Sequence, residues 1–147
     1  MSIKDPIPLE DLQIGQSASL TNLVDDAAVR AFAEVSGDNN PLHLDEAYAR
    51  RTPFRGRIAH GALIASYLSG VLGNELPGPG AIFVRMDIGF QRPVRIGDTL
   101  VAKATIKAID MKTRIVTMDC ECTVGDEIAM TAMATVMVRT RRRKNPA

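Results

Sequence analysis

The sequence is poor in aromatic residues and has almost no net charge. It contains no tryptophan, and aromatic residues make up only 4% of its 147 positions, so the core must be built mainly from aliphatic side chains and methionine. The formal net charge is +1, which gives no global reason to expect nucleic acid or an anionic membrane as a partner. Apolar and charged residues make up 46% and 24%, as in ordinary globular proteins.

Cysteine is also scarce, with Cys120 and Cys122 as the only pair. They are two residues apart in a segment that alternates like a strand, so they share a face with nearly parallel side chains. That is a poor geometry for a mutual disulfide. One close pair, without a spaced Cys/His ligand set, argues for a reducing compartment and against structural zinc.

Long apolar runs are absent. The segment Met1 to Glu10 is polar and contains proline, so we expect no secretory signal. The longest apolar stretch, Ala62 to Leu72, is interrupted by serine and glycine and is too short to span a bilayer. We therefore expect a cytoplasmic protein with no membrane partner.

No repeat, low-complexity block or linker divides the chain, and its length is that of one domain. We expect a single domain over residues 1–147, with an ordered core at about 9–139 and a basic tail at 140–147. Such a tail is usually a solvated, frayed end. Its positive charges could also attract the phosphates of coenzyme A.

Helix signals gather in the first half. After an extended segment at 17–24, Asp25 or Asp26 can cap a helix that ends at Gly37, and Asp45 can cap a short helix at 46–51. A third helix is predicted at about 60–75. It is apolar nearly all the way round, which is typical of a helix enclosed by other structure.

The second half alternates with period two. Even-numbered positions are apolar at 82–90, 102–108, 116–124 and 128–138, with turn residues between these runs. This pattern predicts half-buried antiparallel strands. The fold class is therefore α+β, with a curved antiparallel sheet of about five strands wrapped around the apolar helix.

The densest polar cluster, residues 36–43, reads Ser-Gly-Asp-Asn-Asn-Pro-Leu-His. Pro41 keeps Asn40 out of the helical region, so we expect a loop that can bend Asp38 and His43 toward one point. An Asp and a neutral His around one water make a plausible acid/base pair. The alternative is that Asp38 and Asn40 only form turns and His43 only packs.

A longer stretch resembles a known motif. Residues 32–43, Phe-Ala-Glu-Val-Ser-Gly-Asp-Asn-Asn-Pro-Leu-His, with Ala47 after a short gap, look like the hydratase-2 motif of MaoC-like enzymes. The segments Phe-Arg-Gly-Arg-Ile-Ala-His-Gly (54–61), Leu-Pro-Gly-Pro-Gly (76–80) and Phe-Gln-Arg-Pro-Val (90–94) continue the match, as does Gly97-Asp98. The resemblance runs from about residue 9 to 139 and implies a MaoC-like (R)-specific enoyl-CoA hydratase with a hot-dog fold.

What this resemblance implies is reversible syn hydration of a trans-2-enoyl-CoA to an (R)-3-hydroxyacyl-CoA. Asp38 and His43 would activate the water, Asn40 would support their loop, and the Gly61 N–H would stabilise the thioester oxyanion. Ser69 and Leu72 match positions that line the acyl pocket in related short-chain enzymes. The implied partners are an acyl-CoA substrate and a second copy of the chain, as a homodimer or higher homo-oligomer, with no cofactor, metal or nucleic acid.

Alternatives remain at this point. Gly61 and Ser69 could be close-packing residues, Leu72 a core residue, and His60 a cap or core histidine, so His60 is left out of the chemistry. A thioesterase of the same fold would typically have an acidic residue on the buried helix, and residues 62–74 contain none. A 3-hydroxyacyl-carrier-protein dehydratase would use the same chemistry. A non-catalytic acyl-CoA-binding protein would not need the Asp38/His43 pair.

Overall fold

The structure is a computed structural model that describes residues 2–142. It forms one five-stranded antiparallel sheet in the order β1-β3-β4-β5-β2, so β1 and β2 are the edges. This confirms the predicted α+β architecture. A 3₁₀ turn (Leu9–Asp11) precedes β1 (Ser17–Val24), α1 (Asp26–Ser36), α2 (Pro41–Leu44), α3 (Glu46–Arg50), α4 (Gly61–Asn74), β2 (Ile82–Phe90), β3 (Asp98–Asp110), β4 (Ile115–Val124) and β5 (Glu127–Met137).

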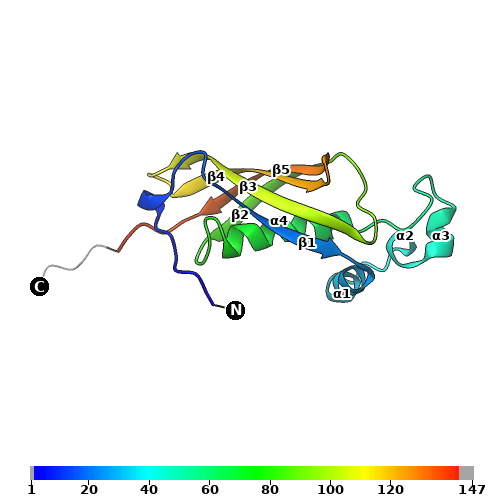
Figure 1. Ribbon diagram of the computed structural model, residues 1–147. Coiled ribbons are helices and arrows are strands. Elements are labelled where there is room, and N and C mark those ends of the chain that lie inside the picture. The colour runs from blue at the N-terminus through cyan, green and yellow to red at the C-terminus, as the bar shows by residue number, and fades with distance from the viewer. Residues whose placement is uncertain (1, 143–147) are drawn as a thin grey trace, which may run out of the picture.

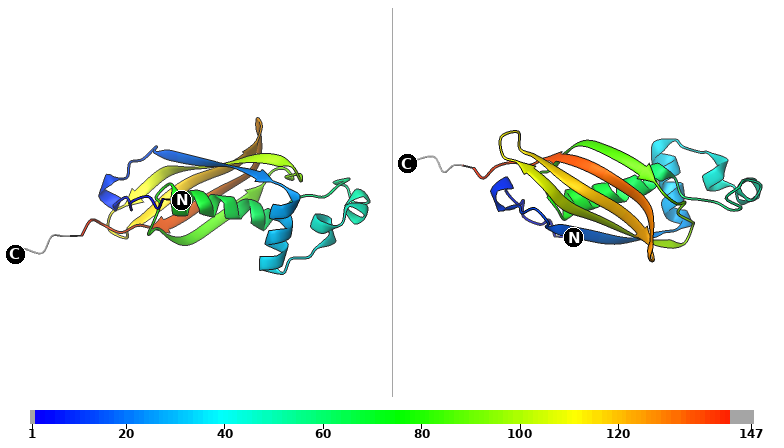
Figure 2. Two further views of the ribbon diagram at one scale, coloured as in Figure 1. Left: turned by 60° about the horizontal axis from the view of Figure 1, so that its bottom comes forward. Right: turned by 90° about the horizontal axis from the view of Figure 1, so that it is seen from above.

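Helix α4 lies along one face of the sheet (Figure 1). The three shorter helices gather at the end where α4 begins, and the C-terminal segment leaves at the opposite end (Figure 2). The sheet-facing stripe of α4 is buried, whereas its other face is exposed in the single chain. The exposed stripe consists of small residues, including Ala62, Ser66, Ser69 and Gly73.

The alternating pattern of β3, β4 and β5 is confirmed by burial. Their even-numbered side chains form the core against α4: Ala102, Ala104, Ile106, Val116, Met118, Cys120, Cys122, Met130, Ala132, Ala134 and Val136. The hydrogen bonds between neighbouring strands fix the register. Because successive side chains of a strand point to opposite faces, these residues all lie on one face of the sheet.

Two β-bulges break this parity where the sequence predicts its continuation. The register shifts between Ile106 and Ala108, so Ala108 is exposed and Ile109 is partly buried instead. A second shift opposite Cys122 leaves Ile128 exposed and buries Ala129. The expectation that Ala108 and Ile128 face the core was therefore wrong, because a bulge inserts one unpaired residue and reverses the facing of those that follow.

Strand β2 also differs from the half-buried strand that was predicted. It pairs only with β5, and of its even-numbered residues only Met86 is partly buried. Its exposed large apolar side chains are Ile82, Phe83, Val84, Ile88 and Phe90. The apolar pattern was identified correctly, but β2 is an edge strand whose side chains are mostly exposed in the single chain.

Cys120 and Cys122 are free and buried, as predicted. No helix among residues 2–142 is long and apolar enough to cross a membrane. Of the predicted basic tail, residues 143–147 lie outside the described part of the chain. Within the described part, Arg141 is paired with Asp11 at 2.6 Å beside the 3₁₀ turn, and its main-chain N–H donates to the Glu10 carboxylate.

Candidate active site

The loop after α1 is shaped by consecutive polar turns. Helix α1 ends at Gly37, which adopts the left-handed conformation with φ of 77° that glycine tolerates best. Asp38 then uses one carboxylate oxygen to accept the Asn40 N–H at 3.1 Å, and the Asn40 side chain accepts the Leu42 N–H at 3.0 Å. Asn40 is thus the cap of α2 and supports the loop. The second carboxylate oxygen of Asp38 has no partner among residues 2–142.

His43 lies in helix α2, which the sequence analysis expected to be loop. Pro41 does hold Asn40 in an extended conformation, but proline itself is favoured at a first helical position, so a short helix follows. The His43 side chain is 8% exposed, and its Nδ1 lies 2.7 Å from the Ile58 carbonyl. Since a carbonyl only accepts, Nδ1 donates its proton there, and Nε2 of the neutral ring remains free to accept one.

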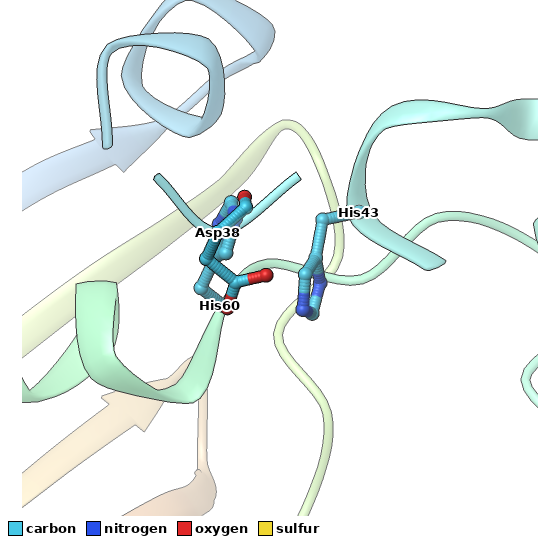
Figure 3. Close-up of side chains that lie close together, drawn as sticks. All are labelled: Asp38, His43 and His60. Atoms are coloured by element: carbon cyan, nitrogen blue, oxygen red, sulfur yellow. The ribbon is translucent and has the colours of Figure 1, made fainter. Parts of the chain in front are cut away.

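Asp38 and His43 meet as expected, together with a residue that was set aside. A carboxylate oxygen of Asp38 and one ring nitrogen each of His43 and His60 all lie within 4.8 Å of one another (Figure 3). His60 is only 1% exposed, and the centroid of its ring lies 4.0 Å from that of His43. No local pattern indicates this contact, because it spans the 22 residues from Asp38 to His60.

Each histidine of the cluster has one ring nitrogen without a hydrogen-bond partner among residues 2–142. The His43 and His60 ring planes are inclined by 32° to each other. Each ring also has one nitrogen bonded to a main-chain carbonyl, of Ile58 and Asp38 respectively.

A mostly apolar cavity of about 350 Å³ opens beside this cluster. His43 and Gly61 line it, and Gly61 is the first residue of α4, where main-chain N–H groups have no partner within the helix. The aromatic ring of Phe90 packs directly on Gly61, since a Cβ added to Gly61 would lie 2.7 Å from the Phe90 Cζ. The other lining residues are Phe54, Ile58, Ala59, Ile64, Gln91, Arg92, Pro93, Val94 and Ala129.

The remaining predicted site residues lie elsewhere. Asn40 and the Asp38 side chain border the histidines but do not line the cavity. Leu72 is 2% exposed and belongs to the core, and Ser69 is on the exposed face of α4. Ile64, which does line the cavity, lies two helical turns before Leu72 on the same face of α4.

Comparison with known proteins identifies the family. A family model described as a MaoC like domain matches residues 10–136. The chain belongs to the MaoC-like family. This confirms the resemblance inferred from residues 32–43.

Several known proteins align with most of this chain. An (R)-specific enoyl-CoA hydratase from Rhodospirillum rubrum is 46% identical over 132 residues, which covers 90% of this chain and 92% of that protein. A 3-hydroxybutyryl-CoA dehydratase from Methylorubrum extorquens is 41% identical over 93% of this chain and 87% of its own. The solved (R)-hydratase of Aeromonas caviae, described as involved in PHA biosynthesis, superposes with a TM-score of 0.85 at 39% identity, covering 88% and 98% of the two chains. The MaoC-like chain therefore has the predicted hot-dog fold.

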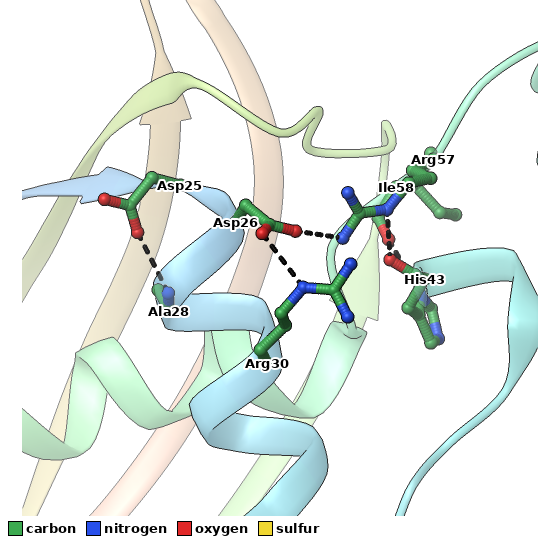
Figure 4. A network of polar contacts seen from close by, with 7 residues as sticks. All are labelled: Asp25, Asp26, Ala28, Arg30, His43, Arg57 and Ile58. Carbon is green, nitrogen blue, oxygen red and sulfur yellow. Dashed lines mark hydrogen bonds and ion pairs between the residues drawn. The ribbon is translucent and has the colours of Figure 1, made fainter. Parts of the chain in front are cut away.

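Arg57 links the main chain of His43 to Asp26 of α1 (Figure 4). The Arg57 Nε donates to the His43 carbonyl at 2.6 Å, and its Nη2 donates to Asp26 at 2.6 Å. Hydrogen bonds from Arg57 and Arg30 lower the pKa of Asp26 below its ordinary value. Arg57 could not be identified from the sequence, because its two partners come from α1 and α2 and no spacing rule connects them.

Proposed function

We propose that this MaoC-like protein is an (R)-specific enoyl-CoA hydratase. The observation that carries the proposal is that His43, whose ring lies close to the Asp38 carboxylate, lines a mostly apolar cavity together with Gly61 at the start of α4. The relatives that match most of the chain are named for hydration or dehydration of CoA thioesters, which favours coenzyme A over a carrier protein as the thiol.

The two side chains suit the activation of one water. The neutral His43 ring presents Nε2 as an acceptor, because its Nδ1–H is bonded to the Ile58 carbonyl. The Asp38 carboxylate has one oxygen engaged with the Asn40 N–H and one free. A water held between them loses a proton to this pair as its oxygen bonds to C3 of the enoyl group. The C2–C3 π pair then takes up a proton at C2, so atoms and charge balance across the cycle.

The negative charge that develops on the thioester oxygen during addition needs a hydrogen-bond donor. We assign this role to the Gly61 N–H, which is at the start of α4 and lines the same cavity as His43. The N-terminal end of a helix carries unpaired N–H groups and a partial positive charge, so it favours a developing oxyanion. The absence of a side chain at Gly61 lets the Phe90 ring pack against the start of α4.

The acyl chain would extend along the apolar wall of the cavity. Ile64 bounds the cavity on α4, and Leu72 lies further along the same helical face. We propose that Leu72 limits how far a chain can reach once Ile64 has been passed. Ser69, on the exposed face of α4, would contribute only if a second copy of the chain covers that face.

We further propose that the protein is a homodimer joined through the free edge of β2. Both edges of the sheet have unpaired main-chain groups, which proteins usually cover. The β2 edge exposes Ile82, Phe83, Val84, Ile88 and Phe90, whereas only Leu23 of β1 is a large exposed apolar residue. Sedimentation at micromolar concentration should give twice the mass of the chain, and a monomer that retains full activity would contradict the dimer.

The proposed function is tested by the hydration rates of Asp38→Asn and His43→Ala on crotonyl-CoA. Both residues lie outside the hydrophobic core, so both variants should fold with thermal midpoints near that of the wild type. Each should lose activity by ~10²–10⁴-fold, which is the usual contribution of a general acid or base. Wild-type turnover in either variant would refute the assigned pair.

A further inference from the structure

His60 contacts the candidate active site through both its Nε2 and its ring. Its Nε2 lies 3.0 Å from the Asp38 main-chain oxygen, and its ring lies against that of His43 at 4.0 Å between centroids. The centroid of the Phe32 ring lies 4.9 Å from that of His60. His60 also directly precedes Gly61. One side chain therefore touches the two residues of the acid/base pair and is covalently joined to the proposed oxyanion donor.

The hydrogen bonding of His60 indicates which of its ring nitrogens carries a proton. A main-chain carbonyl cannot donate, so the bond to Asp38 places a proton on Nε2. Nδ1 is buried and has no hydrogen-bond partner among residues 2–142. In the neutral ring, the proton is therefore on Nε2.

We propose that His60 is a positioning residue that holds Asp38 and His43 in register with the Gly61 N–H. Its N–H fixes the main chain of Asp38, and its ring face fixes the plane of the His43 imidazole. The cap position of α4 is held by its neighbour, because the Ala59 N–H donates to the Val94 carbonyl at 2.7 Å and links the preceding residue to the segment between β2 and β3. This inference rests on the proposed hydratase activity, and it adds a residue that does not itself touch the substrate.

Two substitutions separate the two contacts of His60. His60→Gln keeps an N–H donor of similar reach and removes the ring, whereas His60→Phe keeps a ring and removes the donor. His60→Phe removes the donor to the Asp38 carbonyl, so the loop should shift. Displacement of about 1 Å at a reacting group can cost ~10²-fold in rate, so we expect kcat to fall ~10–100-fold while KM changes less than about threefold. His60→Gln should recover at least part of that loss.

A matched control separates positioning from stability. Val116→Ala removes volume from the core in β4, at a fully buried residue that does not line the cavity. It should lower the thermal midpoint without changing kcat of the folded protein. If His60→Phe behaves like Val116→Ala, with a lower midpoint and an unchanged kcat, the positioning role is wrong. Equal losses of kcat in His60→Gln and His60→Phe would also overturn the role assigned to the hydrogen bond.

A readout that is independent of activity is the ¹⁵N NMR spectrum of the histidine side chains near neutral pH. His60 should show a protonated Nε2 and a bare Nδ1, while His43 should show the opposite tautomer. A proton on Nδ1 of His60 would overturn the inference, whatever the kinetics show. If the wild type does not hydrate crotonyl-CoA, the proposed function fails, but the tautomer measurement still decides whether His60 is held as described.

Discussion

Gly61→Ala is the substitution whose effect follows most directly from the structure. In the first turn of a helix, replacing glycine with alanine ordinarily stabilises by up to ~1 kcal/mol. Here the added Cβ would lie 2.7 Å from the Phe90 Cζ and 3.1 and 3.2 Å from the two Cε atoms. Overpacking of this kind typically costs ~1–3 kcal/mol. Phe90 is 56% exposed and on a strand edge, so part of the strain can be relieved by rotation of its ring.

The net change in stability at Gly61 should therefore be small, within about 2 kcal/mol, but the change in activity should be large. The new methyl group and the displaced ring both occupy the space in front of the Gly61 N–H. Loss of one oxyanion donor typically costs ~10²–10³-fold in rate. We expect kcat/KM on crotonyl-CoA to fall by up to that amount, while urea unfolding stays close to wild type.

Gly73→Ala on the same helix is the matched control. A Cβ at Gly73 meets nothing within 4 Å, and the residue is far from the cavity. This variant should be as stable as the wild type or slightly more stable, with unchanged kinetics. Full activity in Gly61→Ala would refute the assignment of the oxyanion site to the start of α4.

Three further outcomes follow from the structure. Arg57→Met should lower stability at neutral pH. Because Arg57 lowers the pKa of Asp26, the difference from wild type in urea unfolding should shrink as pH falls below the ordinary value of 3.8, where the unfolded carboxyl is protonated. Burial raises the pKa of Cys120 and Cys122 to about 12 from 9.0, so unfolded thiols ionise first and unfolding free energy should decrease as pH rises above 9.0; a flat profile would contradict this. Leu72→Ala should raise kcat/KM for octenoyl-CoA relative to crotonyl-CoA if Leu72 limits the length of the acyl chain. If the free energy of unfolding instead falls by ~2–5 kcal/mol and the chain-length preference is unchanged, Leu72 is a core residue only.

Elements set by local rules could be predicted from the sequence. The Asp25 side chain accepts the Ala28 N–H and Gly37 takes the left-handed conformation, so both ends of α1 are where the sequence places them. Strands β3 to β5 follow their period-two pattern because each is covered on one face. The pairing of Asp38 and His43 was also expected, although α2 was not.

Features that depend on tertiary contact could not be predicted. Nothing in the sequence around His60 indicates that the loop of Asp38 will fold back over it. A bulge such as that at Ala108 depends on the partner strand and leaves no local pattern. The exposure of β2 follows from its place at the edge of the sheet, which alternation alone does not specify. Sequence rules thus identify Asp38 and His43 as neighbours but not the residues that contact them.

The most direct test of the proposed function is hydration of crotonyl-CoA by the purified wild-type protein, followed as loss of the enoyl-thioester absorbance, with chiral analysis of the product. Asp38 and His43 acting on one water should give (R)-3-hydroxybutyryl-CoA as the only enantiomer, and the same protein should dehydrate that product back to the enoyl-CoA. Absence of turnover, or formation of the (S) product, would contradict the account.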